Sequence, residues 1–196
     1  VTFKEGGTNF TNSLLVGTDS TGTLNSAIGN TGVGTGVFGA LTTGDNNVAV
    51  GLNALDVNTT GSENVAVGMG ALDTNTTGAG NISIGCGSMS ANVSGNYNVA
   101  IGRCALDTSV SGSANVAIGD RALYTNTASY NTSVGFFSLA ANTTGASNVA
   151  VGQNSLAANT TGTQNVAVGA SALDANTTGA NNVAVGKDSL KTNTTA

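Results

Sequence analysis

The chain has 196 residues, of which 8% are charged and 39% are hydrophobic, with a formal net charge of −5 and no Pro, Trp or His. The lack of His removes the commonest general base and metal ligand, and five basic residues are too few for the Lys/Arg stripe that binds nucleic acid. No apolar run approaches the ~20 residues of a membrane span. These features argue against an enzyme, a nucleic-acid-binding protein and membrane insertion by this segment. The chain begins with Val rather than Met, which suggests an excised or processed segment.

The first 46 residues are predicted to be degenerate N-terminal rungs or a connector of the same fold. Segments 12–17 and 25–29 resemble shortened strand-glycine units, and segment 40–44 resembles half of the later repeat. Terminal repeats of solenoid proteins are commonly atypical, which suits this interpretation.

From residue 47 to 196 the chain consists of nine copies of one unit. The units are 17 residues apart, with a single step of 16 between Gly119 and Gly135. Each unit opens with Asn and carries a Leu or Met four residues after its glycine. The glycine column consists of Gly51, Gly68, Gly85, Gly102, Gly119, Gly135, Gly152, Gly169 and Gly186.

Each part of the unit has a physical interpretation. The Asn-Val-Ala-Val-Gly run is typical of a short strand, in which both Val side chains lie on one face and Ala on the other. The Ala-Leu pair is expected in a second short extended segment with its Leu pointing inward, and Asn-Thr-Thr-Gly is typical of a turn. The sequence therefore predicts an all-β, parallel β-solenoid of about nine 17-residue rungs.

The small residues of the strand also form a column. Ala is a poor strand residue, so a column of Ala and Ser suggests a face that another backbone approaches closely. Each rung buries few aliphatic side chains, and a second buried face would help to offset the entropy cost of ordering the chain. We therefore expect a subunit interface along Ala49, Ala66, Ser83, Ala100, Ala117, Ser133, Ala150, Ala167 and Ala184.

The repeat resembles a known family of surface fibres. Asn-Val-Ala-Val/Ile-Gly is similar to the head repeats of trimeric autotransporter adhesins, and Ala-Leu-x-x-Asn-Thr-Thr-Gly is similar to repeats of phage tail fibres and bacterial surface fibres. The resemblance covers residues 47–196 well and residues 1–46 poorly. It implies a left-handed parallel β-roll, a parallel homotrimer and binding to host surfaces.

Departures from the repeat indicate where a partner could bind. Most variable positions carry Ala, Ser, Asn, Asp or Thr, whereas rungs four to six carry aromatic and Arg side chains, which dominate recognition sites. The same region contains the one shortened repeat, near residues 128–129, so the bulky side chains could instead fill a gap that the deletion leaves. The candidate receptor contacts are Tyr97, Arg103, Arg121, Tyr124, Tyr130, Phe136 and Phe137.

Other constellations suggest no chemistry, and we expect no catalytic set, no cofactor and no metal. Stacked carboxylates at Asp56, Asp73, Asp107 and Asp174 could bind Ca²⁺, but they skip rungs, so a solvated turn is favoured. Cys86 and Cys104 are 18 residues apart on adjacent rungs, and the sequence leaves open whether they pair or stay free.

The sequence therefore favours a non-enzymatic fibre or adhesin segment at a cell surface or on a virion, which presents a multivalent attachment surface. One alternative is a passive spacer shaft. Another is an ice-binding β-solenoid, for which paired Thr residues such as Thr59 and Thr60 would stack, although the middle rungs interrupt them.

Overall fold

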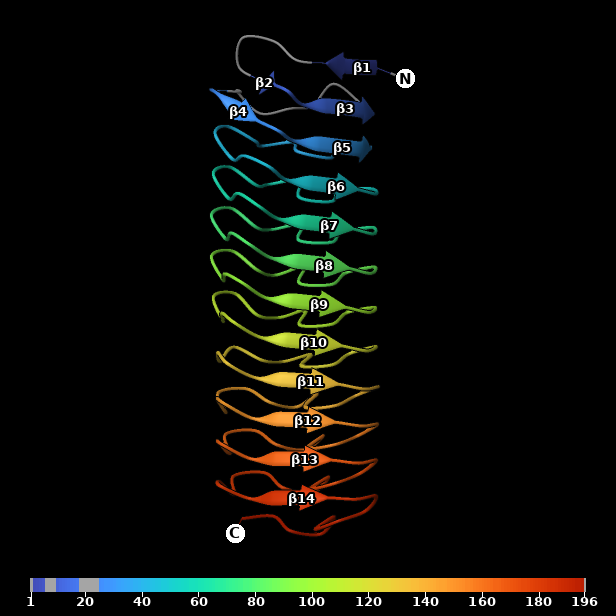
Figure 1. Ribbon diagram of the computed structural model, residues 1–196, viewed down its shortest axis with the longest axis vertical. Coiled ribbons are helices and arrows are strands. Elements are labelled where there is room, and N and C mark those ends of the chain that lie inside the picture. Colours follow the sequence, from blue (N-terminus) through green and yellow to red (C-terminus); the bar gives the residue numbers. More distant parts are fainter. Residues whose placement is uncertain (1, 6–9, 18–24, 196) are drawn as a thin grey trace.

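The computed structural model describes residues 2–5, 10–17 and 25–195, and its strands stack along a rod (Figure 1). One sheet has the order β1-β3-β5-β6-β7-β8-β9-β10-β11-β12-β13-β14, and β2 pairs with β4 in a second sheet. The strands of the first 46 residues are β1 (Thr2–Glu5), β2 (Phe10–Thr11), β3 (Leu14–Gly17), β4 (Ala27–Ile28) and β5 (Thr31–Gly34). The repeat strands are β6 (Val48–Val50), β7 (Val65–Val67), β8 (Ile82–Ile84), β9 (Val99–Ile101), β10 (Val116–Ile118), β11 (Thr132–Val134), β12 (Val149–Val151), β13 (Val166–Val168) and β14 (Val183–Val185).

The predicted parallel β-solenoid is confirmed. Neighbouring repeat strands pair in parallel with equivalent residues opposite one another, as in Ala49 opposite Ala66. The turns pair from rung to rung as well, since Leu55 N–H donates to Ala71 O at 3.1 Å. The shortened repeat keeps the register, because Ser133 lies opposite both Ala117 and Ala150.

The first 46 residues contribute to the same coil in the part that is described. Segment 12–17 supplies strand β3, which pairs in parallel with β5, while β1 pairs with β3 in antiparallel fashion. Segment 25–29 does not supply the next strand of this sheet, because its strand β4 pairs with β2 on another side of the coil. The next rung of the main sheet is β5, which pairs with β6. The 17-residue spacing, followed backward, places Asn30 and Gly34 one repeat before Asn47 and Gly51.

The opening asparagines form a ladder inside the rod. Asn47 donates its backbone N–H and its Nδ2 to Asn30 Oδ1, at 2.9 and 3.0 Å, and a second Nδ2 contact reaches Gly61 O at 2.9 Å. Asn64 repeats these contacts with Asn47 and Gly78. Buried amides are stable only when they are hydrogen-bonded, so each Asn fixes the stacking of two rungs and the position of a turn.

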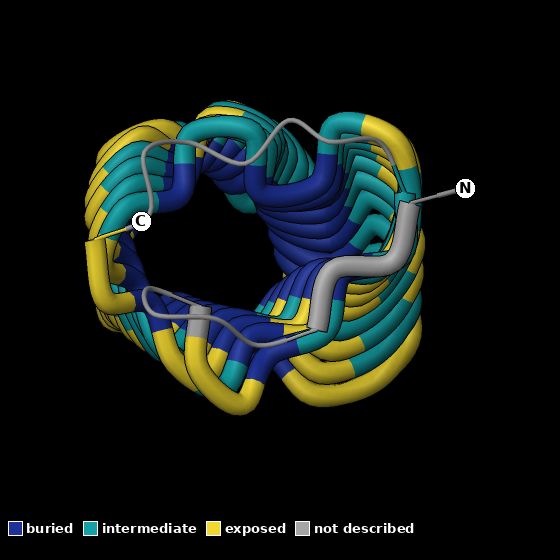
Figure 2. Tube along the Cα trace, turned by 90° about the horizontal axis from the view of Figure 1, so that it is seen from above, coloured by how far each residue is buried: buried dark blue, intermediate teal, exposed yellow. Residues whose placement is uncertain are grey.

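The asparagine of Asn-Thr-Thr-Gly forms a second internal ladder. Asn58 Nδ2 donates to Gly61 O at 2.9 Å and closes its own turn, as the turn prediction requires. Asn75 Nδ2 donates in turn to Asn58 Oδ1 at 2.8 Å. Both asparagines are fully buried, so side chains that the sequence places in turns are part of the interior. Seen along the rod, much of the inner side of the chain trace consists of buried residues, while exposed residues lie at its outer edge (Figure 2).

Eight of the nine residues of the Leu column point inward, as predicted, and Leu55, Leu72, Met89, Leu106, Leu123, Leu139, Leu156 and Leu173 are fully buried. The ninth, Leu190 in the last rung, is 51% exposed. The expected extended conformation is wrong, however, because these residues lie in turns at left-handed dihedrals, with φ of 53° at Leu106. Left-handed residues cost roughly 1–2 kcal/mol each. The turn brings the Leu side chain back toward the strand of the same rung. Burial of that side chain offsets the cost of the left-handed conformation.

Candidate functional surface

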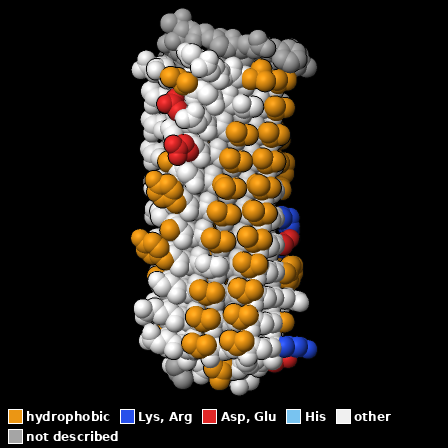
Figure 3. Space-filling model, viewed as in Figure 1, with side chains coloured by type: hydrophobic (Ala, Val, Ile, Leu, Met, Phe, Trp, Pro, Cys, Tyr) orange, Lys and Arg blue, Asp and Glu red, His pale blue; other side chains and the backbone are white. Residues whose placement is uncertain are grey.

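The outer face of the sheet carries two columns of aliphatic side chains. Within each three-residue strand the middle side chain is buried and the two flanking side chains are partly or largely exposed, as at Val48 (36%) and Val50 (37%). The columns run side by side along the rod (Figure 3). We call them the aliphatic strip, which consists of Val48, Val50, Val65, Val67, Ile82, Ile84, Val99, Ile101, Val116, Ile118, Thr132, Val134, Val149, Val151, Val166, Val168, Val183 and Val185.

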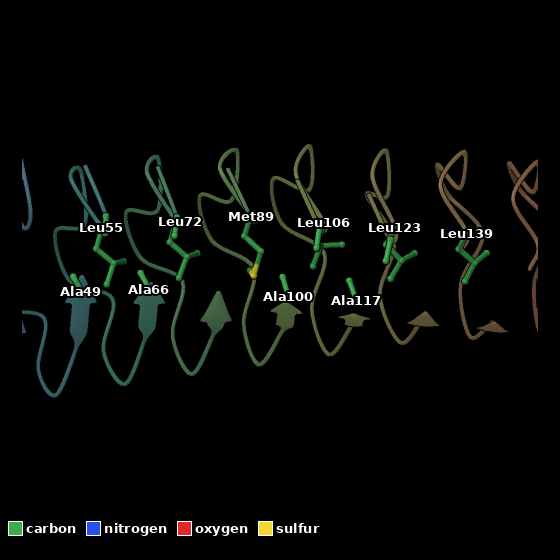
Figure 4. Close-up of a cluster of buried hydrophobic side chains, with 14 of the residues drawn as sticks. Ala49, Leu55, Ala66, Leu72, Met89, Ala100, Leu106, Ala117, Leu123 and Leu139 are labelled. Atoms are coloured by element: carbon green, nitrogen blue, oxygen red, sulfur yellow. The ribbon is translucent and has the colours of Figure 1, made fainter. Parts of the chain in front are cut away.

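The column of small residues lies inside the coil, which corrects its assignment to a subunit interface. Ala49, Ala66, Ser83, Ala100, Ala117, Ser133, Ala150 and Ala167 are fully buried, and Ala184 is 3% exposed. The small side chains of this column leave room for the Leu column of the same chain, whose side chains face them across the interior (Figure 4). Their side chains have no surface to offer another subunit. The face of the strands that is open to a partner is the aliphatic strip.

Five of the seven candidate receptor contacts converge where the chain leaves the strands. The Arg121 guanidinium carbon is 5.3 Å from the centre of the Phe137 ring on the next rung and 6.0 Å from that of Tyr124. The rings of Phe136 and Phe137 are 4.5 Å apart, and Phe136 is half exposed. Such cation–π contacts contribute about 0.5–1 kcal/mol at exposed sites. We call Arg103, Asp120, Arg121, Tyr124, Phe136 and Phe137 the cationic-aromatic cluster.

Arg103 joins this cluster through an ion pair that the sequence reasoning missed. Its Nε is 3.0 Å from Asp120 Oδ2, and its Nη2 is 3.3 Å from Asp120 Oδ1. The signal was present, because Arg103 and Asp120 have opposite charges one repeat apart, and residues at this spacing lie on adjacent rungs.

The other two candidates, Tyr97 and Tyr130, lie at the opposite end of the strands. Each directly precedes the Asn that opens a rung, and their exposed fractions are 72% and 70%. The seven residues thus form two groups, one on each side of the strands, rather than one contiguous patch.

The shortened repeat does not require the Phe side chains as filler. Ala128 O takes the place of the missing glycine carbonyl and accepts from Asn115 Nδ2 at 2.9 Å and from Asn126 Nδ2 at 2.8 Å. This turn leads into strand β11, whereas Phe136 and Phe137 follow that strand. Of the candidate contacts, only Tyr130 lies beside the deletion in the sequence.

The cysteines lie on adjacent rungs, as expected, and both are free thiols. Cys104 N–H donates to Cys86 O at 3.0 Å, and the segment that follows each glycine is a turn. Burial, followed by the charge of Asp107, raises the pKa of the Cys104 thiol. A raised pKa keeps this thiol protonated and weakens it as a nucleophile.

The hydroxyl group of the first threonine in each of two pairs is hydrogen-bonded to the backbone and so is not available for an exposed array. Thr59 Oγ1 donates to Thr76 O at 2.9 Å, and Thr160 Oγ1 donates to Thr177 O at 3.0 Å. These hydroxyls satisfy the backbone of the next rung, so the first Thr of a pair stabilises the stacking of the turns.

Among residues 2–5, 10–17 and 25–195, no group of three or more Cys, Asp, Glu or His side chains could hold a metal ion. Burial, and then the negative charge of Asp56 on the preceding rung, raises the pKa of Asp73. Over the same residues, no helix is long and apolar enough to cross a membrane.

Comparisons with protein-family models, with curated proteins and with solved structures found no match.

Proposed function

We propose that this chain is a segment of an extracellular or virion fibre, which assembles as a parallel homotrimer through the aliphatic strip and presents an attachment surface to host cells or substrata. The observation that carries the proposal is the strip of aliphatic side chains along the rod, in which Thr132 is the one position that is neither Val nor Ile. The structural role needs no catalytic group, in keeping with the lack of His.

The strip is large enough to form the centre of a subunit interface but not the whole of it. Nine strands at ~4.8 Å, each about 10 Å long, give a footprint of about 400 Å². The largest apolar patch on a typical monomer is about 300–600 Å² and often functional. A standard interface buries about 800 Å² on each partner, so the turns on both sides of the strip would also take part.

The pattern of the strip favours parallel chains. All eighteen positions are Val or Ile except Thr132, and none is charged. In a parallel homotrimer with its axis along the rod, each strand would meet its own copies at the same level. Aliphatic side chains would then face aliphatic side chains, and Thr132 would face Thr132.

Light scattering on the purified chain tests the assembly. We expect three times the mass of one chain for the native protein and the mass of a single chain for the double variant Ile101→Glu, Ile118→Glu, because like charges would converge at the axis. The control is Val110→Glu, which places a carboxylate on a turn position that is 49% exposed. A native chain that is monomeric, or a folded double variant that keeps the native mass, contradicts assembly through the strip.

Adsorption to candidate host cells tests attachment separately. The triple variant Arg121→Ala, Tyr124→Ala, Phe136→Ala removes most of the cationic-aromatic cluster while leaving the strip intact. Three copies of a weak site gain avidity, so we expect a large loss of adsorption. Equal adsorption by both proteins would place attachment outside this cluster, and adsorption by neither would make this segment a passive spacer shaft.

A further inference from the structure

We propose that Tyr97 and Tyr130 form a two-ring platform that binds an extended, neutral β-1,4-linked polysaccharide. The inference rests on the proposed attachment function and names the class of ligand for a second part of the surface, on the other side of the strands from the cationic-aromatic cluster.

The two tyrosines occupy equivalent positions in the coil. Tyr97 N–H donates to Ala79 O at 3.0 Å, and Tyr130 N–H donates to Ser113 O at 3.1 Å. Their φ angles are 58° and 65°, so the two side chains leave similar left-handed turns. One rung, that of Ala114, lies between them, which places the two Cα atoms about 9.6 Å apart along the rod at ~4.8 Å per rung.

Each ring has a small residue on the preceding rung. A Cβ atom on Gly80 would lie 2.7 Å from Cδ1 and 2.9 Å from Cε1 of Tyr97, so the Tyr97 ring lies directly over this glycine. Ala114 occupies the corresponding position one rung before Tyr130, so the only side chain in this column between the two tyrosines is a methyl group. The other rungs of the repeat carry polar or charged residues in this column, namely Asn46, Glu63, Ser147, Gln164 and Asn181.

The spacing fits a ribbon-like polysaccharide. In an extended β-1,4-linked chain each sugar is turned over relative to the next, so the same face recurs once per disaccharide. The length of that disaccharide matches the two-rung distance, whereas one rung is too short. The apolar face of a pyranose ring packs against exposed aromatic rings, which supply large contact areas at low entropy cost.

The surroundings of the rings suit a neutral ligand. Segments 94–98 and 127–131 contain no charged residue. Asn96 Oδ1 accepts from Ala79 N–H at 2.8 Å, and Ser129 Oγ accepts from Ser113 N–H at 3.0 Å. These polar side chains hold the turns that carry the rings, and they place neutral groups beside the path that a sugar chain would follow.

The experiment is calorimetric titration of the native chain, in its own oligomeric state, with cellohexaose, cellobiose and maltohexaose. We expect cellohexaose to bind about tenfold more tightly than cellobiose, because only the longer ligand reaches both rings and one stacking contact contributes on this scale. Maltohexaose, whose α-linked chain curves, should bind no better than cellobiose.

Three variants test the geometry. Tyr130→Ala should reduce the affinity for cellohexaose to that for cellobiose. The double variant Ala114→Tyr, Tyr130→Ala keeps two tyrosines but places them one rung apart, and it should bind like the single variant. Gly80→Asn introduces the residue found at Asn46 and Asn181, which suits the turn, and it should weaken binding by displacing the Tyr97 ring.

Equal affinity for cellohexaose and cellobiose, or undiminished cellohexaose binding by the one-rung variant, overturns the proposal. So does a lack of binding by the native chain, including the case in which assembly buries the rings. If host-cell adsorption still requires the cationic-aromatic cluster in any of these cases, the polysaccharide platform fails while the attachment function stands.

Discussion

Ser109 occupies the place in the second asparagine ladder from which an Asn would donate to Asn92 Oδ1. Asn92 itself donates to Asn75 Oδ1 at 2.7 Å, so the ladder is intact up to this rung. Within the described part of the chain, Asn92 Oδ1 and Ser109 Oγ are both buried without a hydrogen-bond partner. A buried acceptor that lacks its donor costs about 1–3 kcal/mol.

Replacing Ser109 with Asn should therefore stabilise the protein. We expect the free energy of unfolding to rise by about 1–2 kcal/mol, because the new amide can donate to Asn92 Oδ1. Urea unfolding followed by circular dichroism measures the change. The matched control, Asn75→Ser, creates the same break in an intact part of the ladder and should destabilise by a similar amount. Equal stability of Ser109→Asn and the native chain would show that the ladder does not limit stability at this rung.

Much of the fold follows from the sequence because the 17-residue period is strict. Stacked rungs and inward Leu side chains are consequences of that period. The orientation of the strands was harder to predict, since alternation places Val48 and Ala49 on opposite faces without saying which face is inside. Hydrophobicity alone favours burying Val, yet the Leu column of the same chain leaves room only for Ala or Ser on the inner face of the strand.

The candidate site was predictable as a set of residues but not as a surface. Tyr97 and Phe136 were found as departures from the repeat, and one pair of opposite charges could have linked Arg103 to Asp120. The separation of the tyrosines from the cationic-aromatic cluster depends on which end of the strand each turn adjoins. The rung that begins at Asn30 was not predicted as a full repeat, because its core residues differ from the consensus in size. It has Gly32 in place of Ala and Phe38 in place of Leu.

Gly32 and Phe38 compensate for each other in that rung. A Cβ on Gly32 would lie 2.8 Å from Leu15 Cδ1, 2.8 Å from Val37 Cγ1 and 3.0 Å from Phe38 Cε2. Gly32→Ala should therefore destabilise by about 1–3 kcal/mol through overpacking. The triple variant Gly32→Ala, Val37→Ala, Phe38→Leu reproduces the consensus rung and should recover most of that loss in urea unfolding. If the triple variant is less stable than Gly32→Ala alone, the compensation is wrong.

Asp73 gives the chain a local response to pH. Burial, and then Asp56, raises the pKa of Asp73, so the folded state binds this proton more tightly than the unfolded state does. The ionised form therefore destabilises the fold above the folded pKa, and this penalty disappears as the pH falls below the ordinary Asp range. Asp73→Asn should stabilise the chain at neutral pH and have no such effect at low pH. Asp174→Asn is the control, because its neighbours at one repeat are Ala157 and Lys191 rather than Asp. The same pH dependence in both variants would contradict the assignment.

The glycine that ends each strand should be the least replaceable residue of the rung. Gly102 has a φ of 135°, and a Cβ there would lie 2.5 Å from Gly119 O and 2.6 Å from Gly119 C, both backbone atoms of the next rung. Because that neighbour cannot move without breaking the stack, Gly102→Val should cost more than the ~2–5 kcal/mol of Leu106→Ala, which removes only buried side-chain volume.

The control for this glycine is Gly70→Ala, in a turn where φ is 64° and nothing lies within 4 Å of the added Cβ. It should cost only the roughly 1–2 kcal/mol of a left-handed residue. Thermal unfolding of the three variants gives the order directly. A Gly102→Val variant as stable as Gly70→Ala would mean that the rungs can separate at the glycine column without loss of the coil.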